Sequence, residues 1–410
     1  GVSAAELRHI LERMELTLSD HEPGATRGLG LHNVLFMGAE LLALERDNDP
    51  CLPLVLIEEP EAHLHPQLQL RLIEFFQKET ATTGADARNL QVLLTSHSPN
   101  IASKVGLNQI TLMAGGQAFS LRSGQTALDP TDYEFLERFL DVTKSDLFFA
   151  RGLMIVEGDA EALLLPTVAE LLGCPLTAAG VSIINVGSVG LFRYSKIFQR
   201  AAGPSVPVRV ACLADRDIPP DAAKDMFKKP RKTESDYSKE EIAGRLAKAT
   251  ELDRGPVKTF VSPCWTLEHD LVLGGLGPEV HQAIRLAVKS RNVQRSLTDK
   301  ERADLCTEAQ KEYGDWLTGG KAGAVLACLV YEPLFDGAAS KAETAQFLAR
   351  ILTSRFKDKA SELRSKLPHY LIEAIEYATS STSSTTATPG NSTGPAASAT
   401  STGTAAPGNH

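Results

Sequence analysis

Four acidic side chains in the middle of the chain have the types and spacing to hold a divalent metal ion. Two of them, Glu157 and Glu161, follow the apolar stretch 148–156 and open a predicted helix that continues over 162–172. Residues four apart on a helix lie on one face, so both carboxylates are expected to point the same way. This pattern predicts one half of a metal site at the start of the helix.

The other two acids, Asp215 and Asp217, follow a second apolar stretch, 208–213. Strand alternation predicts that both carboxylates point in one direction at the end of this strand. Carboxylates gathered in this way resist ionising together unless a cation compensates them. Because oxygen-only ligands suit Mg²⁺ or Mn²⁺, the sequence predicts a site for a hard divalent cation.

A second group of polar residues has the pattern of a nucleotide-hydrolysing site. Glu58 and Glu59 follow the apolar stretch 51–57, and Ser96-His97-Ser98-Pro99 follows the apolar stretch 90–95. Such positions place one carboxylate beside a phosphate-bound Mg²⁺ and another beside an attacking water. The chain has no G-x-x-x-x-G-K-[ST] loop to hold phosphates, so we expect it to bind nucleotide poorly alone. An absent N-terminal half is the simplest explanation.

The elements that must position these groups alternate between apolar strands and helices. This order is typical of an α/β fold with a parallel sheet, whose functional loops lie at the carboxyl ends of the strands. An amphipathic helix is predicted over 4–16, with apolar residues three and four apart. The segment 379–410 consists almost entirely of Ser, Thr, Ala, Gly and Pro, a composition that predicts a disordered tail.

The overall composition excludes several classes of protein. With 410 residues, 43% of them hydrophobic, the chain has room for two or three packed domains. The six cysteines form no Cys-x-x-Cys pair, which argues against a disulfide scaffold or a zinc ribbon. No apolar run reaches the roughly 18 residues of a membrane span and no signal peptide is recognisable, so a cytoplasmic protein without membrane contact is expected. The net charge of −9 argues against a generally basic nucleic-acid coat but allows a local basic surface.

The first motif group resembles part of an ABC-type ATPase of the SMC kind. The stretch LVLIEEPEAHLHP is similar to the Walker B and D-loop region, and TSHSP is similar to the His switch, with His97 as the γ-phosphate sensor. Gly28-Leu29-Gly30 stands where the signature loop is expected. The residue at the usual Walker B aspartate position is Glu58, which weakens the expected Mg²⁺ coordination. The resemblance implies an incomplete nucleotide site at Gly28, Gly30, Glu58, Glu59 and His97.

The second motif group resembles the Toprim catalytic domain of topoisomerases, primases and certain nucleases, on the match to VEGDAE and LADRD. An ATPase segment that runs into a Toprim domain resembles the overcoming-lysogenization-defect (OLD) family of nucleases, over about residues 26–335. Within that family the chain is most similar to the group associated with helicase partners and Gabija-type phage defence. The predicted organisation is an ATPase part over 1–130, a Toprim domain with a helical insert over 131–378, and a tail over 379–410.

This resemblance implies a DNA endonuclease that uses two Mg²⁺ or Mn²⁺ ions. One ion lowers the pKa of an attacking water and the other stabilises the leaving 3′ oxygen. Glu157 matches the Toprim glutamate that serves as ligand or general base, Glu161 an added ligand, and Asp215 with Asp217 the metal-binding pair. Full-length relatives imply coupling to ATP, dimerisation through the ATPase part and a helicase partner.

Three further positions are implied by the resemblance. Glu268 matches a third acidic site and is preferred to Asp270, which is also a candidate ligand. Lys321 matches a lysine that stabilises the charge of the pentavalent phosphate. Ordinary structural roles stay open: a solvated helix residue for Glu161, a helix cap for Asp270 and a surface lysine for Lys321.

Two alternatives to a nuclease follow from the same motifs. No tyrosine stands in a recognisable nucleophilic context and no zinc element is present, which argues against a topoisomerase or a primase. A non-catalytic SMC-like fragment with a structural Toprim domain is the main rival, and it predicts that the acids are dispensable. The basic run 228–232 (KKPRK) is either a solvated loop or an aid to DNA docking.

Overall fold

The computed structural model describes Gly30 and residues 33–39, 54–81, 90–187, 190–293 and 295–380. The predicted helix over 4–16, Gly28 and nearly all of the predicted tail lie outside the described residues.

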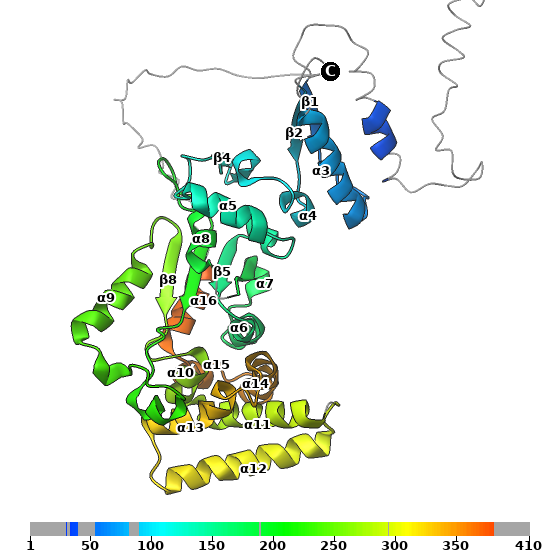
Figure 1. Ribbon diagram of the computed structural model, residues 1–410. Helices are drawn as coiled ribbons and strands as arrows, with labels where there is room; N and C mark the ends of the chain where they lie inside the picture. Colours follow the sequence, from blue (N-terminus) through cyan, green and yellow to red (C-terminus); the bar gives the residue numbers. More distant parts are fainter. Residues whose placement is uncertain are drawn as a thin grey trace, which may run out of the picture.

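A four-stranded parallel sheet forms the centre of the larger part of the chain (Figure 1). Its strands are β5 (Gly152–Val156), β6 (Val181–Asn185), β7 (Arg209–Ala214) and β8 (Val257–Val261). Their order is β6-β5-β7-β8, and every neighbouring pair is parallel. The carboxyl ends of all four strands therefore lie at one edge of the sheet, and the predicted α/β fold with parallel strands is confirmed.

Both faces of this sheet are covered, as the continuous apolar composition of its strands predicts. Every residue of β5 is buried. Met154 and Val156 join one hydrophobic cluster together with α6 (Asp159–Leu171), whereas Leu153 and Ile155 join a second cluster on the opposite face. The strand period of two thus assigns alternate side chains to two separate cores.

Helices cover the first face of the sheet and form a helical layer on that side (Figure 1). They are α10 (Leu267–Leu271), the π-helical turn η5 (Val272–Leu276), α11 (Gly277–Val293), α12 (Asp299–Thr318), α13 (Gly323–Phe335), α14 (Lys341–Phe356), α15 (Ala360–Lys366) and α16 (His369–Thr379). Helix α14 packs against α6 and α11, and α12 packs against α11. Helix α16, the last described helix, packs against β5, β7 and β8, so it completes the core beneath the sheet.

The second face is covered by shorter elements. They are the hairpin of β3 (Thr111–Ala114) and β4 (Gln117–Ser120), α5 (Pro130–Phe139), the 3₁₀ turns η1 (Leu107–Gln109) and η2 (Lys144–Phe148), and α8 (Leu191–Lys196). The four-residue helix α7 (Leu176–Ala179) leads into β6. Helix α5 begins at the predicted domain boundary, and the division into three parts stays a prediction.

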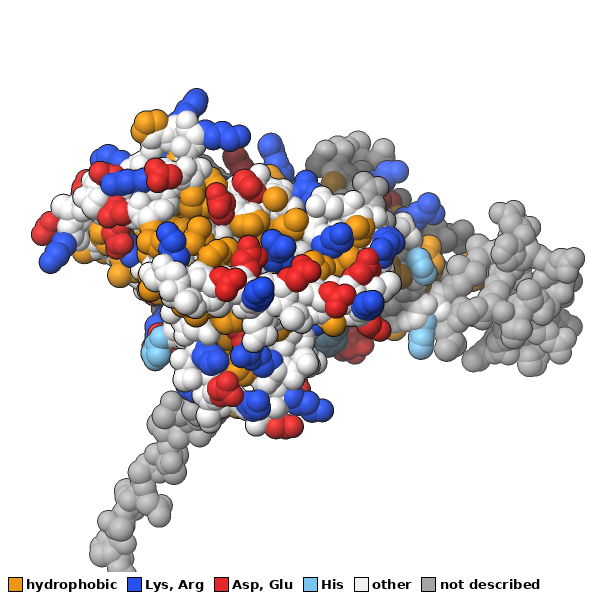
Figure 2. Space-filling model, turned by 90° about the horizontal axis from the view of Figure 1, so that it is seen from below, with side chains coloured by type: hydrophobic (Ala, Val, Ile, Leu, Met, Phe, Trp, Pro, Cys, Tyr) orange, Lys and Arg blue, Asp and Glu red, His pale blue; other side chains and the backbone are white. Residues whose placement is uncertain are grey.

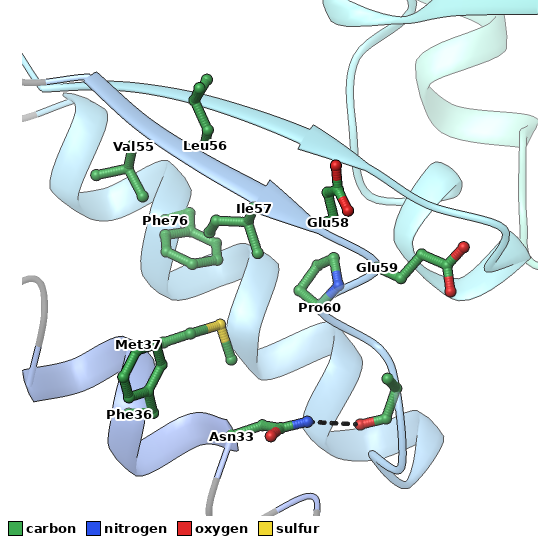
Figure 3. Close-up of a pocket in the computed structure, with 11 residues that line it drawn as sticks. Asn33, Phe36, Met37, Val55, Leu56, Ile57, Glu58, Glu59, Pro60 and Phe76 are labelled. Carbon is green, nitrogen blue, oxygen red and sulfur yellow. Dashed lines mark hydrogen bonds between the residues drawn. The ribbon is translucent and has the colours of Figure 1, made fainter.

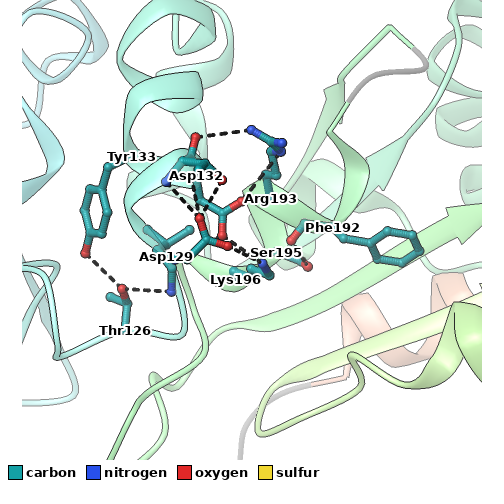
Figure 4. Close-up of polar contacts among 10 residues, drawn as sticks. Thr126, Asp129, Asp132, Tyr133, Phe192, Arg193, Ser195 and Lys196 are labelled. Carbon is teal, nitrogen blue, oxygen red and sulfur yellow. Dashed lines mark hydrogen bonds and ion pairs between the residues drawn. The ribbon is translucent and has the colours of Figure 1, made fainter.

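A polar network joins α5 to α8 (Figure 4). Asp129 caps α5, and its carboxylate accepts hydrogen bonds from the backbone N–H groups of Thr131 and Asp132. The buried carboxylate of Asp132 lies 2.7 Å from Lys196 Nζ and 3.5 Å from Arg193 Nε. One acid therefore holds two cations from the neighbouring helix.

The connection between β7 and β8 contains less helix than predicted. Only α9 (Lys239–Thr250) is an α-helix, whereas η3 (Asp221–Met226) and η4 (Glu234–Asp236) are short 3₁₀ turns. Ser238 caps α9 in a capping box with Glu241, which explains why the regular helix begins there.

The N-terminal described part contains a smaller parallel pair, β1 (Leu54–Glu58) and β2 (Gln91–Thr95), with α3 (Pro66–Ala81) and α4 (Pro99–Ala102). Leu56 and Leu93 are exposed in the described structure, whereas Ile57 and Val92 pack against the buried side chains of α3. A pocket of about 350 Å³ lies between β1, α3 and the helical residues 33–39 (Figure 3).

Replacing Asp132 should test the network between α5 and α8. Asp132→Asn leaves the half-buried Lys196 with only the more distant carboxylate of Asp129, at 3.6 Å, and we expect a loss of about 2 to 4 kcal/mol in the free energy of unfolding. Urea denaturation measures the loss. Glu134→Gln, on the exposed side of the same helix, should change stability by less than about 0.5 kcal/mol. Equal effects of the two substitutions would contradict this account.

Candidate active site

The predicted acidic residues meet at the carboxyl edge of the four-stranded sheet. Glu157 follows β5 directly, Asp215 follows β7 directly, and Glu268 lies in α10, the first helix after β8. Because the strands are parallel, their carboxyl ends bring together residues that are more than a hundred positions apart in the sequence. We call Glu157, Glu161, Asp215, Asp217 and Glu268 the acidic cluster.

Glu157 and Glu161 lie on either side of the start of α6. Burial, with the charges of Asp217 and Glu161, raises the pKa of Glu157 to about 7. Burial is also the main cause that raises the pKa of Glu161, and Glu268 adds to it. Gly158 lets the Glu161 carboxylate fold back over the helix start, since a Cβ at Gly158 would lie 2.9 Å from Glu161 Oε2.

Asp215 and Asp217 lie in a turn after β7 rather than on the strand. Burial is the main cause that raises the pKa of Asp215 to about 8; the charge of Lys341 opposes this rise, and those of Glu161, Glu268 and Asp217 add to it. Asp217 has a positive φ of 56°, a left-handed conformation that aspartate tolerates better than most residues. The predicted proximity of the two carboxylates is found, but its predicted origin in strand alternation is wrong.

Glu268 and Asp270 have different surroundings although both are buried. Neither carboxylate oxygen of Glu268 makes a well-directed hydrogen bond within the described residues, so this acid is available to a ligand. Asp270 accepts hydrogen bonds from Ser262 Oγ at 2.8 Å and from the backbone N–H groups of Cys264 and Trp265 at 3.3 and 3.2 Å. Its oxygens organise the turn between β8 and α10, and we therefore remove Asp270 from the predicted metal ligands.

The cation that belongs to the acidic cluster is Lys341, which sequence reasoning missed. Its Nζ lies 3.1 Å from Glu268 Oε2. Burial alone would lower the pKa of Lys341, but Glu268, Tyr331 and Asp215 raise it above the usual range. One signal for Lys341 was present in the sequence: it stands in the first turn of a helix. The helix dipole disfavours a cation there unless acids compensate the charge.

Lys321, the predicted cation, lies elsewhere. It is exposed in the turn between α12 and α13, and its backbone N–H bonds to Trp316 O. None of the ion pairs found among the described residues joins Lys321 to an acid of the cluster. The cation that the structure places beside the acidic cluster is thus Lys341 and not Lys321.

The cluster supplies the donors that a hard divalent ion requires. A bound cation would give a partner to Glu268 Oε1, which accepts no hydrogen bond within the described residues, and would favour the ionised forms of Glu157, Glu161 and Asp215. Within the part of the chain that the structure describes, no three potential ligands lie close enough to form a finished metal site. The chemistry of the donors, all of them carboxylate oxygens, fits a hard divalent cation.

The predicted nucleotide site is only partly assembled in the described residues. Glu59, which has a positive φ of 44°, lies 3.4 Å from His97 Nε2 through its Oε1 atom. Glu61 was not predicted, yet it accepts hydrogen bonds from Ser96 Oγ at 2.8 Å and His97 N at 2.7 Å and so fixes the turn after β2. Glu58 and the pocket residue Ile57 point to opposite sides of β1 (Figure 3).

Gly30 is buried against the turn that follows β1. A Cβ at this position would lie 2.3 Å from the backbone oxygen of His63, so only glycine permits the approach. Gly28 lies outside the described residues, and its predicted role stays a prediction.

Two family models match the sequence. Residues 16–102 match an AAA ATPase domain, and residues 148–217 match the TOPRIM domain of overcoming-lysogenization-defect-like proteins. The chain thus contains one segment similar to an ATPase domain and one similar to a TOPRIM domain. The TOPRIM match is to the OLD-like type, which confirms the predicted resemblance to the OLD family.

Individual relatives are distant. Over 174 residues, 42% of the chain and 29% of the relative, it is 25% identical to the uncharacterized protein YbjD of Escherichia coli (strain K12). It is 24% identical over 188 residues, 44% of the chain and 34% of the relative, to the OLD nuclease of Thermus scotoductus. The chain therefore spans about a third of the length of these curated relatives.

Solved structures of OLD proteins also match. The C-terminal region of the Burkholderia pseudomallei OLD protein has 24% identity and a TM-score of 0.34, and the match covers 56% of this chain and 98% of that one. The corresponding region from Xanthomonas campestris pv. campestris has 23% identity and a TM-score of 0.33, with coverage of 57% and 94%. Among the described helices, none has the length and apolar character of a membrane span.

Repulsion within the acidic cluster should make the thermal stability of the protein depend on pH. The raised pKa of Asp215 means that the metal-free protein loses stability as the pH rises from about 4 to about 8. Asp215→Asn removes one charge, so we expect its midpoint of thermal unfolding at pH 8 to exceed that of the wild type by about 2 to 4 °C, with little difference near pH 4.

Addition of Mg²⁺ or Mn²⁺ should reverse this order, because the wild type gains stability from ion binding whereas the variant gains less. Asp304→Asn, an exposed site on α12, is the charge-matched control and should behave as the wild type does. A wild-type melting temperature that changes neither with pH nor with added divalent ions would contradict the metal-site assignment.

Proposed function

We propose that this chain carries the catalytic part of a DNA endonuclease that depends on divalent metal ions, Mg²⁺ or Mn²⁺. The OLD-like TOPRIM domain and the OLD nuclease relative support a nuclease family. The observation that carries the proposal is the convergence of five carboxylates and one ammonium group at the carboxyl edge of a parallel sheet.

The residues divide between ion binding and proton transfer. Asp215, Asp217 and Glu268 would hold ions, and Glu161 would complete the set. When bound, a pair of such ions supplies activation of a water and charge neutralisation at the leaving 3′ oxygen. Glu157, whose pKa of about 7 suits a group that exchanges protons near neutral pH, would accept the proton of the attacking water.

Lys341 would stabilise the reacting phosphate. Its ammonium group is held beside Glu268 and stays protonated because of the surrounding acids. A fixed positive charge in a partly buried site stabilises the extra negative charge that phosphorus acquires when water attacks. Breakage of the bond to the 3′ oxygen then leaves a free hydroxyl on one product and a 5′ phosphate on the other.

ATP would act on this chemistry only together with a phosphate-binding loop that these 410 residues do not contain. The pairing of Glu59 with His97 supports a γ-phosphate-sensing role for the turn after β2. Dimerisation through the ATPase part, a helicase partner and a role in phage defence stay predictions.

Cleavage of supercoiled plasmid tests the proposed function. Wild-type protein with Mg²⁺ or Mn²⁺ should give nicked or linear products, whereas EDTA, Asp215→Ala and Glu157→Gln should each lower the rate by at least about 100-fold. Lys341→Met should lower it by a similar factor through lost charge stabilisation, and Lys321→Met should leave it within twofold. A folded wild-type protein that cuts neither plasmid nor single-stranded DNA in any divalent ion would favour the non-catalytic alternative.

A further inference from the structure

The connection between β7 and β8 carries an exposed run of positive charge, Lys228–Lys232, which we call the basic loop. Four of its five residues are basic, and all five are exposed. Among the described residues, no carboxylate lies within 4.0 Å of any of these four cations. Two of them lie over rings of their own segment, Arg231 at 5.5 Å from the centroid of Phe227 and Lys232 at 5.4 Å from that of Tyr237.

The first stem of the basic loop is fixed beside the helix that carries Glu268. The ring of Phe227 lies 6.2 Å from that of Trp265 and 5.2 Å from that of Phe335. Trp265 directly precedes Thr266, the residue that begins α10. The preceding turn η3 packs against α13, so this stem is held by the same layer that supports the acidic cluster.

The second stem is fixed by a hydrogen-bond network. Thr233 is fully buried, and its hydroxyl donates to Asp221 Oδ1 at 2.6 Å. Asp221 also accepts from Ser235 Oγ at 2.7 Å, and Asp236 forms a capping box with Thr233. Polar contacts between the segments before and after the loop therefore hold its base together, while its four cations have no carboxylate partner within the described residues.

Arg216 ties this second stem to the acidic cluster. It stands between Asp215 and Asp217, its Nη2 atom lies 2.9 Å from Glu234 Oε1, and its Nη1 atom donates to the backbone oxygen of Pro263. With both stems anchored, the five residues between them can reach outward by at most about 10 Å. The basic loop is thus tethered at both ends to segments that flank the acidic cluster, Trp265 beside α10 and Arg216 between Asp215 and Asp217.

Before any divalent ion binds, a cluster of five carboxylates and one ammonium group repels the phosphates of a nucleic acid. At physiological salt an exposed charge acts over about 8 Å, so attraction must come from cations placed nearby. We propose that the basic loop binds the phosphate backbone of duplex DNA and so positions the strand at the acidic cluster. This inference rests on the proposed function and names the surface by which the substrate is held.

A suitable control set lies on other elements of the helical layer. Figure 2 views the molecule from the side of α12, and basic and acidic side chains alternate across this face without a patch of one sign. Lys300 and Lys311 belong to α12, and Lys357 and Lys359 follow α14 at the end opposite to Lys341. All four are exposed.

The test compares two variants with equal changes in net charge. One carries Lys228→Gln, Lys229→Gln, Arg231→Gln and Lys232→Gln, and the other carries Gln at the four control positions. Binding of a fluorescent 30-base-pair duplex is measured by anisotropy in Ca²⁺ over a range of KCl concentrations. The loop variant should bind at least about 10-fold more weakly at 0.1 M salt, and its slope of log K against log salt should fall by about 2 to 3, near 0.9 for each lost phosphate contact. The control should stay within twofold of the wild type.

Kinetics separate positioning from catalysis. The loop variant should raise KM for plasmid at least about fivefold and leave kcat within twofold, with an unchanged melting temperature. Lys228→Gln with Lys229→Gln alone should give an intermediate effect.

The inference is overturned if the loop variant and the control bind with the same affinity and salt slope, or if the wild type does not bind DNA. Binding is measured without cleavage, so the two proposals fail separately. Loss of binding in the loop variant of a protein that never cuts would overturn the proposed function alone, and cutting with loop-independent binding would overturn the inference alone.

Discussion

Mutual repulsion among carboxylates at one edge of a sheet is the constraint on which the rest of the structure depends. Burial raises the pKa of Glu157, Glu161 and Asp215, so each of them is ionised only at a cost to stability. A decayed site would have no physical reason to keep these charges together, whereas a site that binds cations needs them. The single ammonium group of Lys341 offsets part of the charge.

The surrounding fold is arranged to keep this edge rigid. A sheet buried on both faces fixes the ends of β5 and β7, and α6 and α14, which carry Glu161 and Lys341, pack against each other. Because α14 lies in the C-terminal helical region, the helices after β8 are part of the site and not an appendage. The turn η3 and the Arg216–Glu234 pair extend the same support to the basic loop.

The sequence predicted those parts of the site that depend on local order along the chain. Apolar stretches followed by acids placed Glu157 and Asp215 at strand ends. Because the strands of such a sheet are parallel, their carboxyl ends, and the acids that follow them, lie at the same edge. Asp270 could not be distinguished from Glu268 in this way, because its neighbours in sequence say nothing about the three hydrogen bonds that its oxygens accept. Lys341 was missed because it reaches the cluster through the packing of α14 on α6, which no local pattern encodes.

The same reasoning explains why the two lysines are so easily confused. Lys321 and Lys341 both stand near the start of a helix, where a cation is unfavourable unless something compensates it. For Lys321, exposure to water compensates the unfavourable position of the charge, and for Lys341, contact with Glu268 does so. A cation held against the helix dipole by buried acids has less conformational freedom than a surface lysine, and in the proposed nuclease this fixed charge would face the reacting phosphate. The position of Lys341 therefore follows from the acidic cluster, as the cluster in turn requires a cation at this edge of the sheet.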